Sequence, residues 1–85
     1  MSLPKGVIIM VWSSLVLAEL DEKDNITRPI EYTIVPDNEA DTANGRFGES
    51  LPASQALLGH LTGDTVETTI DDRPVRLRVV SIAHG

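Results

Sequence analysis

Polar and apolar residues alternate with a period of two in the stretch 29–35, and this period is typical of β-strands. The alternation places Ile30, Tyr32 and Ile34 on one face, and Pro29 is admissible because it opens the strand. Since a strand of this kind has one apolar face, we expect that face to pack into the core.

The same alternation predicts two further strands near the C-terminus. Residues 65–70 are rich in β-branched side chains, and residues 73–82 carry apolar and charged side chains on opposite faces. Asp71 and Asp72 lie between these stretches and predict a hairpin turn. The last strand has Val75, Leu77 and Val79 on one face and Arg76 and Arg78 on the other. The two arginines are interpreted as a solvated face opposite Glu67 rather than as a partner-binding stripe, which is the open alternative.

The first apolar stretch, residues 6–20, consists of strand-forming residues and is interrupted by Ser13 and Ser14. We therefore expect two strand pieces, the first over residues 7–12. The alternative is a signal peptide, because Lys5 precedes an apolar run and small residues follow it. The run is shorter than the ~20 apolar residues that a membrane-spanning helix needs, so no membrane contact is predicted.

Two acidic segments join the predicted strands. Residues 21–25 are expected to form an exposed hairpin loop, and residues 37–45 a polar loop. Clustered carboxylates could instead bind a divalent cation, which prefers oxygen ligands. Asp37, Glu39 and Asp41 of the second loop have the spacing that begins a calcium-binding EF-hand loop. However, Thr42 stands where that motif requires Gly, and Gly48 stands where it requires Glu. No metal site is predicted.

The middle of the chain predicts a turn, a short strand, one helix and a return to strand. Asn44 and Gly45 form a strong turn signal, because glycine accepts positive φ without a Cβ clash. Pro52 has the fixed φ that suits the first turn of a helix, and Gly59 ends that helix. The pattern therefore predicts an α+β fold with about five strands and one short helix.

Composition and net charge limit the size of the core and the types of partner that this protein can bind. An 85-residue chain without cysteine makes one modest core with no disulfide or thiolate metal site, which is compatible with a reducing cytoplasm. The formal charge of -6 disfavours unaided binding to nucleic acid, whose affinity comes largely from Lys and Arg. A protein partner is favoured. Residues 1–6 are interpreted as a vector-derived or disordered start, and residues 7–83 as the domain.

No residue set in the chain predicts catalysis. The two histidines are His60, which follows the helix-ending glycine, and His84, which is close to the terminus. Ser50 lies in a segment that lacks the closing glycine of a nucleophile elbow. Since a nucleophile needs a base within hydrogen-bond reach, we expect neither enzyme activity nor a cofactor from this chain.

Several blocks of the chain occur in the order and at the spacings of one bacterial family. The blocks are Tyr32-Thr33-Ile34-Val35, Glu39-Ala40-Asp41, Asn44-Gly45-Arg46, Pro52, Ala56-Leu57-Leu58-Gly59 and Gly63-Asp64-Thr65-Val66. From about residue 15 to 82, the chain resembles the C-terminal domain of the GreA/GreB transcript-cleavage factors, which are transcription elongation factors.

This resemblance implies an FKBP-like antiparallel sheet wrapped on one helix. It implies a cytoplasmic, non-catalytic module that docks on the largest subunit of core RNA polymerase beside the secondary channel. DNA binding is implied only by association with the family, and no direct contact of this chain with nucleic acid is expected. In that family the cleavage effect belongs to an N-terminal coiled coil whose acidic tip helps hold a metal ion in the polymerase active site.

The resemblance also implies a docking loop just before the helix, which in the family usually reads Asp-Ser-Pro. Here the corresponding residues are Glu49, Ser50, Leu51 and Pro52. Pro52 matches, Ser50 stands where the acid is usual and Leu51 where the serine is usual, and Glu49 is one place earlier. The plainer reading of Pro52 is that it only starts a helix.

Three alternatives remain open on the sequence. The Rnk-type regulators of nucleoside diphosphate kinase carry a similar domain. An FKBP-type peptidyl-prolyl isomerase would need an apolar pocket lined with aromatics, for which Trp12, Tyr32 and Phe47 are available. A homo-oligomer could form through the apolar N-terminal strand.

Overall fold

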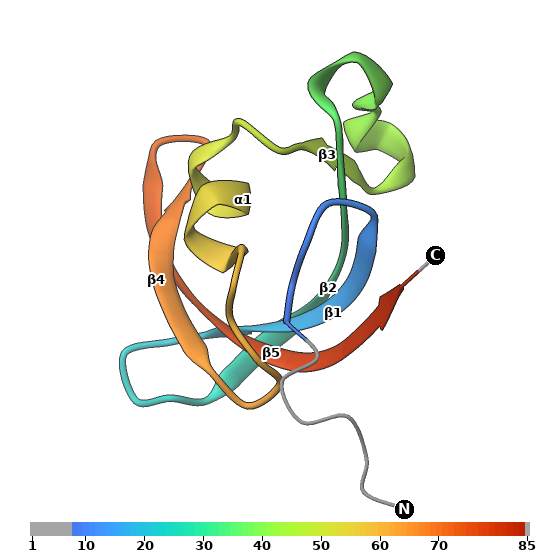
Figure 1. Ribbon diagram of the computed structural model, residues 1–85. Coiled ribbons are helices and arrows are strands. Elements are labelled where there is room, and N and C mark those ends of the chain that lie inside the picture. Colours follow the sequence, from blue (N-terminus) through green and yellow to red (C-terminus); the bar gives the residue numbers. More distant parts are fainter. Residues whose placement is uncertain (1–7, 85) are drawn as a thin grey trace, which may run out of the picture.

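A computed structural model describes residues 8–84 as a five-stranded sheet and one short helix (Figure 1). The elements are β1 (Ser13–Leu20), β2 (Ile26–Val35), the 3₁₀ turns η1 (Asp37–Glu39) and η2 (Thr42–Asn44), β3 (Arg46–Gly48), α1 (Pro52–Leu57), β4 (Thr65–Ile70) and β5 (Arg73–His84). The strand order is β3-β2-β1-β5-β4. The predicted α+β class with about five strands and one helix is confirmed. The sheet is mixed and not wholly antiparallel as expected, because β3 pairs parallel to β2 while the other neighbours are antiparallel.

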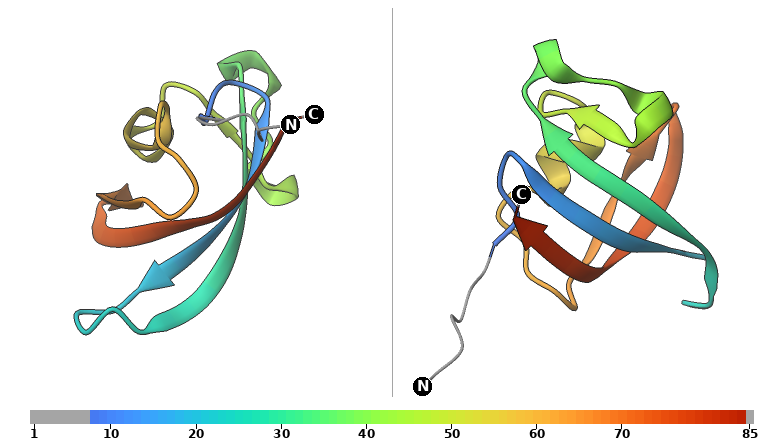
Figure 2. Two further views of the ribbon diagram at one scale, coloured as in Figure 1. Left: turned by 60° about the horizontal axis from the view of Figure 1, so that its bottom comes forward. Right: turned by 90° about the vertical axis from the view of Figure 1, so that its right-hand side faces the viewer.

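The sheet curls around α1, which lies on its concave side (Figures 1 and 2). The inward faces of the strands form the core, as the period-two alternation predicts. Tyr32 and Ile34, predicted as core residues of β2, are almost fully buried, and Ile30 packs against the cluster. The buried residues of the cluster are Ile9, Leu15, Leu17, Tyr32, Ile34, Ala53, Leu57, Val66, Val75, Leu77 and Val79.

A β-bulge in β5 changes which residues face the core. Val16 of β1 pairs with Ser81, but the next residue, Leu17, pairs with Val79, so Val80 is an extra residue on β5. An extra residue reverses the alternation, because successive side chains point to opposite faces. Beyond the bulge, Ile82 therefore packs against the core, while Val80 is exposed.

Strand β2 begins at Ile26, three residues earlier than the alternation predicted, so Pro29 lies inside it. Pro29 pairs with Ala18 of β1, while β3 covers only residues 33–35 on the other side of β2. A proline has no N–H to donate and is tolerated where a strand edge is unpaired. The open edge beside Pro29 explains why the proline does not end the strand.

The strand predicted over residues 7–12 is not present; residue 7 lies outside the described residues, and 8–12 form a non-strand segment that ends in a tight turn. Ser13 N–H donates to the Met10 carbonyl at 3.0 Å, and Trp12 has φ +77°, in the left-handed region. Ile9 is held by two main-chain hydrogen bonds to residues 59 and 60. The turn at Trp12 separates residues 8–12 from the sheet, and β1 is a single strand that starts at Ser13. The interpretation of residues 1–6 also concerns residues outside those described.

The predicted loops are confirmed in place, with contacts that the sequence did not show. Asp21 accepts hydrogen bonds from the N–H groups of Asn25 and Lys23, which lower the pKa of its carboxyl group. Arg76 pairs with Asp24 of this loop, although Glu67 is its register partner in β4. This ion pair therefore links the β1–β2 hairpin to β5.

One buried polar contact joins the helix to the sheet. The Tyr32 hydroxyl of β2 and the Ser54 hydroxyl of α1 are 2.6 Å apart, and both side chains are almost fully inaccessible. A buried hydroxyl without a partner costs ~1–3 kcal/mol, so each residue satisfies the other. The contact links α1 to β2, while the helix packs mainly against β4.

We expect Trp12→Gly to be more stable than Trp12→Ala by about 1 kcal/mol, because alanine keeps the Cβ strain of a left-handed residue and glycine removes it. Thermal unfolding measures the difference, at ~4–8 °C per kcal/mol for a domain of this size. The control is Val16, an exposed residue of β1, where alanine should be more stable than glycine. Equal stability of the two Trp12 variants would contradict the left-handed turn.

We expect Tyr32 to ionise late in the folded protein. Burial raises the pKa of its phenol, and the hydrogen bond with Ser54 opposes part of that shift. The neutral phenol therefore stabilises the fold below the unfolded pKa of ~10, and this contribution is lost as the pH rises through the folded value. Because the chain has one tyrosine, tyrosinate absorbance reports on it alone. The chain unfolded in urea is the control, and coincident titration of both states would show that the phenol is not buried.

Candidate functional site

The four residues of the predicted docking loop lie in and just after a tight turn between β3 and α1. Leu51 N–H donates to the Gly48 carbonyl at 3.2 Å, which places Glu49 and Ser50 at the centre of the turn. Leu51 is the N-cap residue of α1 and Pro52 is its first residue. The prediction that Pro52 starts the helix is confirmed, and the structure brings all four residues together.

Three hydrogen bonds from different elements hold this turn. Glu49 N–H donates to the carbonyl of Val35 at 2.8 Å, and Ser50 N–H donates to Asp37 Oδ1 at 3.1 Å. Gln55 Nε2 donates to the Glu49 carbonyl at 2.7 Å. Since β2, η1 and α1 each supply one contact, the turn has a defined conformation although it is on the surface.

Gly48 allows the close approach of Asp37 to the turn. A Cβ built on Gly48 would lie 2.6 Å from Asp37 Oδ1, which is shorter than real Cβ contacts. The carboxylate occupies the space of the missing side chain while it accepts the Ser50 N–H. The sequence predicts Asp37 only as part of a polar loop and does not predict this role. No local signal reveals it, because the contact spans thirteen residues.

The turn presents one acidic and two apolar side chains to its surroundings. Ser50, Leu51 and Pro52 are exposed, with 39% of Leu51 accessible, whereas Glu49 is half-buried. A carboxylate therefore does lie in the turn, at Glu49, one residue before the position where the resemblance predicts an acid. The arrangement suits contact with a surface that is partly apolar and partly basic.

An apolar cavity of about 660 Å³ opens beside the turn, on the concave side of the sheet. Tyr32 and Phe47 stack in its wall, with ring centroids 4.1 Å apart and an interplanar angle of 7°. Leu51 and Pro52 belong to the docking loop and to this wall at once. Trp12 is not among the residues that line it. The lining residues are Arg28, Pro29, Ile30, Tyr32, Thr42, Phe47, Leu51, Pro52, Ala53, Thr69, Ile70, Asp71 and Asp72.

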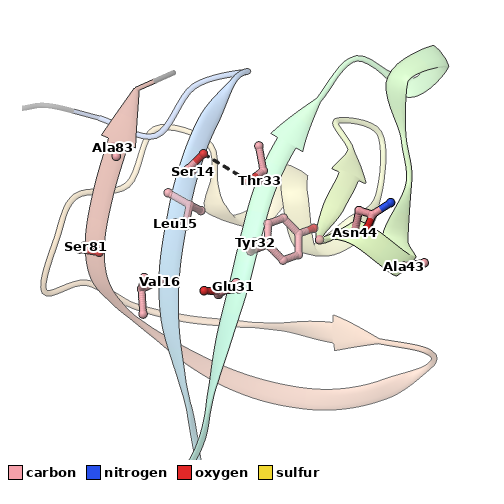
Figure 3. A pocket seen from close by; sticks show the side chains of 11 residues that line it. Ser14, Leu15, Val16, Glu31, Tyr32, Thr33, Ala43, Asn44, Ser81 and Ala83 are labelled. Carbon is pink, nitrogen blue, oxygen red and sulfur yellow. Dashed lines mark hydrogen bonds between the residues drawn. The ribbon is translucent and has the colours of Figure 1, made fainter.

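A second hollow, of about 580 Å³, lies on the outer face of the sheet across β5, β1 and β2 (Figure 3). Its lining includes small residues such as Ser14, Ser81 and Ala83, and Thr33 Oγ1 donates to Ser14 Oγ at 3.3 Å within it. Ala43 and Asn44 of η2 lie at the β2 side of the hollow. Glu31 is its one charged residue, so the hollow holds no set of groups for acid–base or nucleophilic chemistry.

His60, which was considered above for catalysis, forms a structural contact with Asp64. His60 Nδ1 lies 3.0 Å from Asp64 Oδ2, and Asp64 also accepts the Leu61 N–H. The Leu61 hydrogen bond, followed by the contact with His60, lowers the pKa of Asp64. Within residues 8–84, no group of three or more His, Cys, Asp or Glu side chains is placed to hold a metal ion.

No helix in the described part of the chain has the length and hydropathy required to cross a membrane.

Comparison with known proteins places the chain in a family. The family model "Transcription elongation factor, GreA/GreB, C-term" matches residues 13–84. The transcription elongation factor GreA of Chlorobaculum parvum is 31% identical over 74 residues, which are 87% of this chain and 45% of the relative. GreA of Pseudomonas putida is 26% identical over 83 residues, which are 98% of this chain and 49% of the relative.

Solved structures of similar proteins have the same fold. The GreA factor homolog Gfh1 of Thermus thermophilus matches with a TM-score of 0.78 at 24% identity, covering 100% of this chain and 53% of that chain. A GreA/GreB factor from Nitrosomonas europaea matches with a TM-score of 0.73 at 21% identity, covering 93% of this chain and 62% of that chain. The chain thus spans about half the length of the curated relatives it matches. Since the family model covers nearly all the described residues, the chain belongs to the GreA/GreB family of transcription elongation factors and corresponds to its C-terminal domain.

Proposed function

We propose that this domain binds RNA polymerase without catalysing a reaction, and that it docks through Glu49, Ser50, Leu51 and Pro52 on the largest subunit near the secondary channel. The observation that carries the proposal is the position of the exposed Leu51 and Pro52, in a turn held from three elements and at the mouth of an apolar cavity. Membership of the GreA/GreB family supports the choice of partner.

The rigidity of the turn favours binding. A flexible loop loses conformational entropy when it docks, at ~0.5–1.5 kcal/mol for each side chain that is immobilised. The contacts to Val35, Asp37 and Gln55 already hold the turn in the free protein. Less free energy is then lost in ordering the turn, so more of the hydrophobic free energy from burying Leu51 and Pro52 against a partner appears as binding affinity.

The cavity provides room for an apolar side chain of the partner. Its volume of about 660 Å³ is within the range of ~300–1,000 Å³ that is common for ligand sites. Asp71, Asp72 and Arg28 line it, and Glu49 lies in the adjacent turn, so its surroundings carry more acidic than basic side chains. A partner segment with an apolar anchor and basic neighbours therefore fits this side of the domain.

The proposal assigns a binding role only. The chain spans about half the length of its GreA relatives, and no transcript-cleavage step is derived from its residues. The proposed partner implies a cytoplasmic location. The second candidate function is peptidyl-prolyl isomerisation, which is favoured by one observation, the stacked Tyr32 and Phe47 in an apolar cavity.

We expect Leu51→Ala to weaken binding of the purified chain to core RNA polymerase about tenfold, which corresponds to ~1.4 kcal/mol. The control is Leu61→Ala, because Leu61 is equally exposed, at 39%, and lies outside the cavity. Pro52→Ala combined with Glu49→Ala should also weaken binding, with Glu22→Ala as the control for loss of an exposed acid. Titration of labelled chain with polymerase, followed by fluorescence anisotropy, measures all four.

Equal loss of affinity in Leu51→Ala and Leu61→Ala would refute docking through the turn. Absence of saturable binding by the wild-type chain would refute the partner itself. An assay of proline-peptide isomerisation on the same preparation tests the second candidate, and Phe47→Leu should abolish any such activity if the cavity is its site. Circular dichroism of each variant establishes that the fold is retained.

A further inference from the structure

The turn before α1 has three successive main-chain N–H groups, in residues 49–51, and each of them has an acceptor. The first and the third donate to main-chain carbonyls, those of Val35 and Gly48. The second, Ser50 N–H, donates to Asp37 Oδ1 at 3.1 Å. Asp37 begins η1, which lies beside β3 (Figure 1). The bond to Asp37 is therefore the one of the three that a change of side chain can remove.

Gly48 provides the space that the Asp37 carboxylate occupies. A Cβ on Gly48 would lie 2.6 Å from Asp37 Oδ1, while the next atoms, Asp37 Cα and Cγ, are at the ordinary contact distance of 3.5 Å. The φ of Gly48 is outside the left-handed region, so the backbone there accepts an alanine without strain. The position of the carboxylate, and not the backbone conformation, therefore requires glycine at this residue.

From these contacts we propose that Asp37 is a positioning residue of the docking turn. Its carboxylate holds the Ser50 N–H and thereby keeps Leu51 and Pro52 in place, and Gly48 is the glycine that admits it. What acts on the turn is an acceptor oxygen, so the negative charge of Asp37 is not required and Asp37 makes no contact with the partner. The effect on a partner rests on the proposed function, because it concerns the same turn.

The contact determines how often the turn has the conformation that binds. Without it, the Ser50 N–H is left to water and the turn samples other conformations, as weakly held surface segments do. An apparent dissociation constant rises in inverse proportion to the fraction of molecules in the competent conformation. If this fraction falls to about one fifth, binding to RNA polymerase weakens about fivefold, which corresponds to ~1 kcal/mol.

The test compares two substitutions of Asp37. Asp37→Ala removes the acceptor, whereas Asp37→Asn removes the charge and keeps an acceptor oxygen. We expect the alanine variant to increase the solvent exchange of the Ser50 amide in the free chain, measured by NMR, and to weaken polymerase binding about fivefold. The asparagine variant should stay within about twofold of the wild type in both measurements, since it retains the hydrogen bond.

The matched control is Glu39→Ala, which removes an exposed acid from the same 3₁₀ turn. Within residues 8–84, the Glu39 side chain makes no hydrogen bond or ion pair. This variant should leave the Ser50 exchange and the affinity for polymerase unchanged.

A double-mutant cycle tests the dependence of Gly48 on Asp37. In the wild-type chain, Gly48→Ala should lower the melting temperature and weaken binding, because the new Cβ displaces the carboxylate. In the Asp37→Ala background the carboxylate is absent, and the same substitution should leave the melting temperature unchanged or raise it. An alanine that fits the native φ of a glycine reduces the freedom of the unfolded chain.

Equal effects of Gly48→Ala in the two backgrounds would overturn the proposal, and so would unchanged Ser50 exchange in Asp37→Ala. Equal loss of affinity in the alanine and asparagine variants would show that the charge of Asp37 acts on the partner instead. The exchange and unfolding measurements need no polymerase, so they decide on Asp37 even if the wild-type chain does not bind and the proposed function fails. If Leu51→Ala weakens binding but Asp37→Ala does not, the proposed function stands and the role of Asp37 is refuted.

Discussion

A helix of six residues is not stable in water by itself, because the cost of starting a helix exceeds what a turn and a half of hydrogen bonds returns. In this protein the curled sheet supplies the missing stability. Ala53 and Leu57 are buried against the strands, and the Ser54 hydroxyl meets the Tyr32 hydroxyl at 2.6 Å with both side chains inaccessible to solvent. Together with the packing of α1 against β4, this contact with β2 positions α1 and the turn that precedes it.

The position of α1 against the sheet determines the conformation of the turn before it and the exposure of Leu51. Because α1 begins at Pro52 against the sheet, the preceding turn lies between β2, η1 and α1. It donates hydrogen bonds to β2 and η1 and accepts one from α1. Leu51 stays exposed at the mouth of the cavity in spite of these contacts. A single exposed apolar residue is ordinary by itself; Leu51 supports the proposed docking because it is exposed beside the cavity in a turn of defined conformation. The family membership of the chain supports the proposal that this turn docks on a partner.

The edges of the sheet illustrate a second constraint, which is that unpaired strands attract other strands unless something prevents it. Pro29 obstructs the free part of β2, and the loop at Gly63 and Asp64 covers β5 at Val79. The bulge that makes Val80 an extra residue turns Ile82 into the core and leaves Val80 outside. One irregularity thus completes the core at the end of the sheet and interrupts the edge of β5.

The sequence by itself determined most of the strands, the start of the helix at Pro52 and the family, because period-two alternation, proline geometry and motif spacing are local properties of the chain. Only the tertiary structure decided that residues 8–12 turn away at Trp12 instead of forming a strand, since the main-chain bonds of Ile9 lie with residues 59 and 60. It also decided that Asp37 holds the turn before α1 and that the cavity forms from β2, β3, α1 and the β4–β5 hairpin. Contacts of this kind join residues far apart in the chain, and their free energy depends on where the curled sheet brings those residues together.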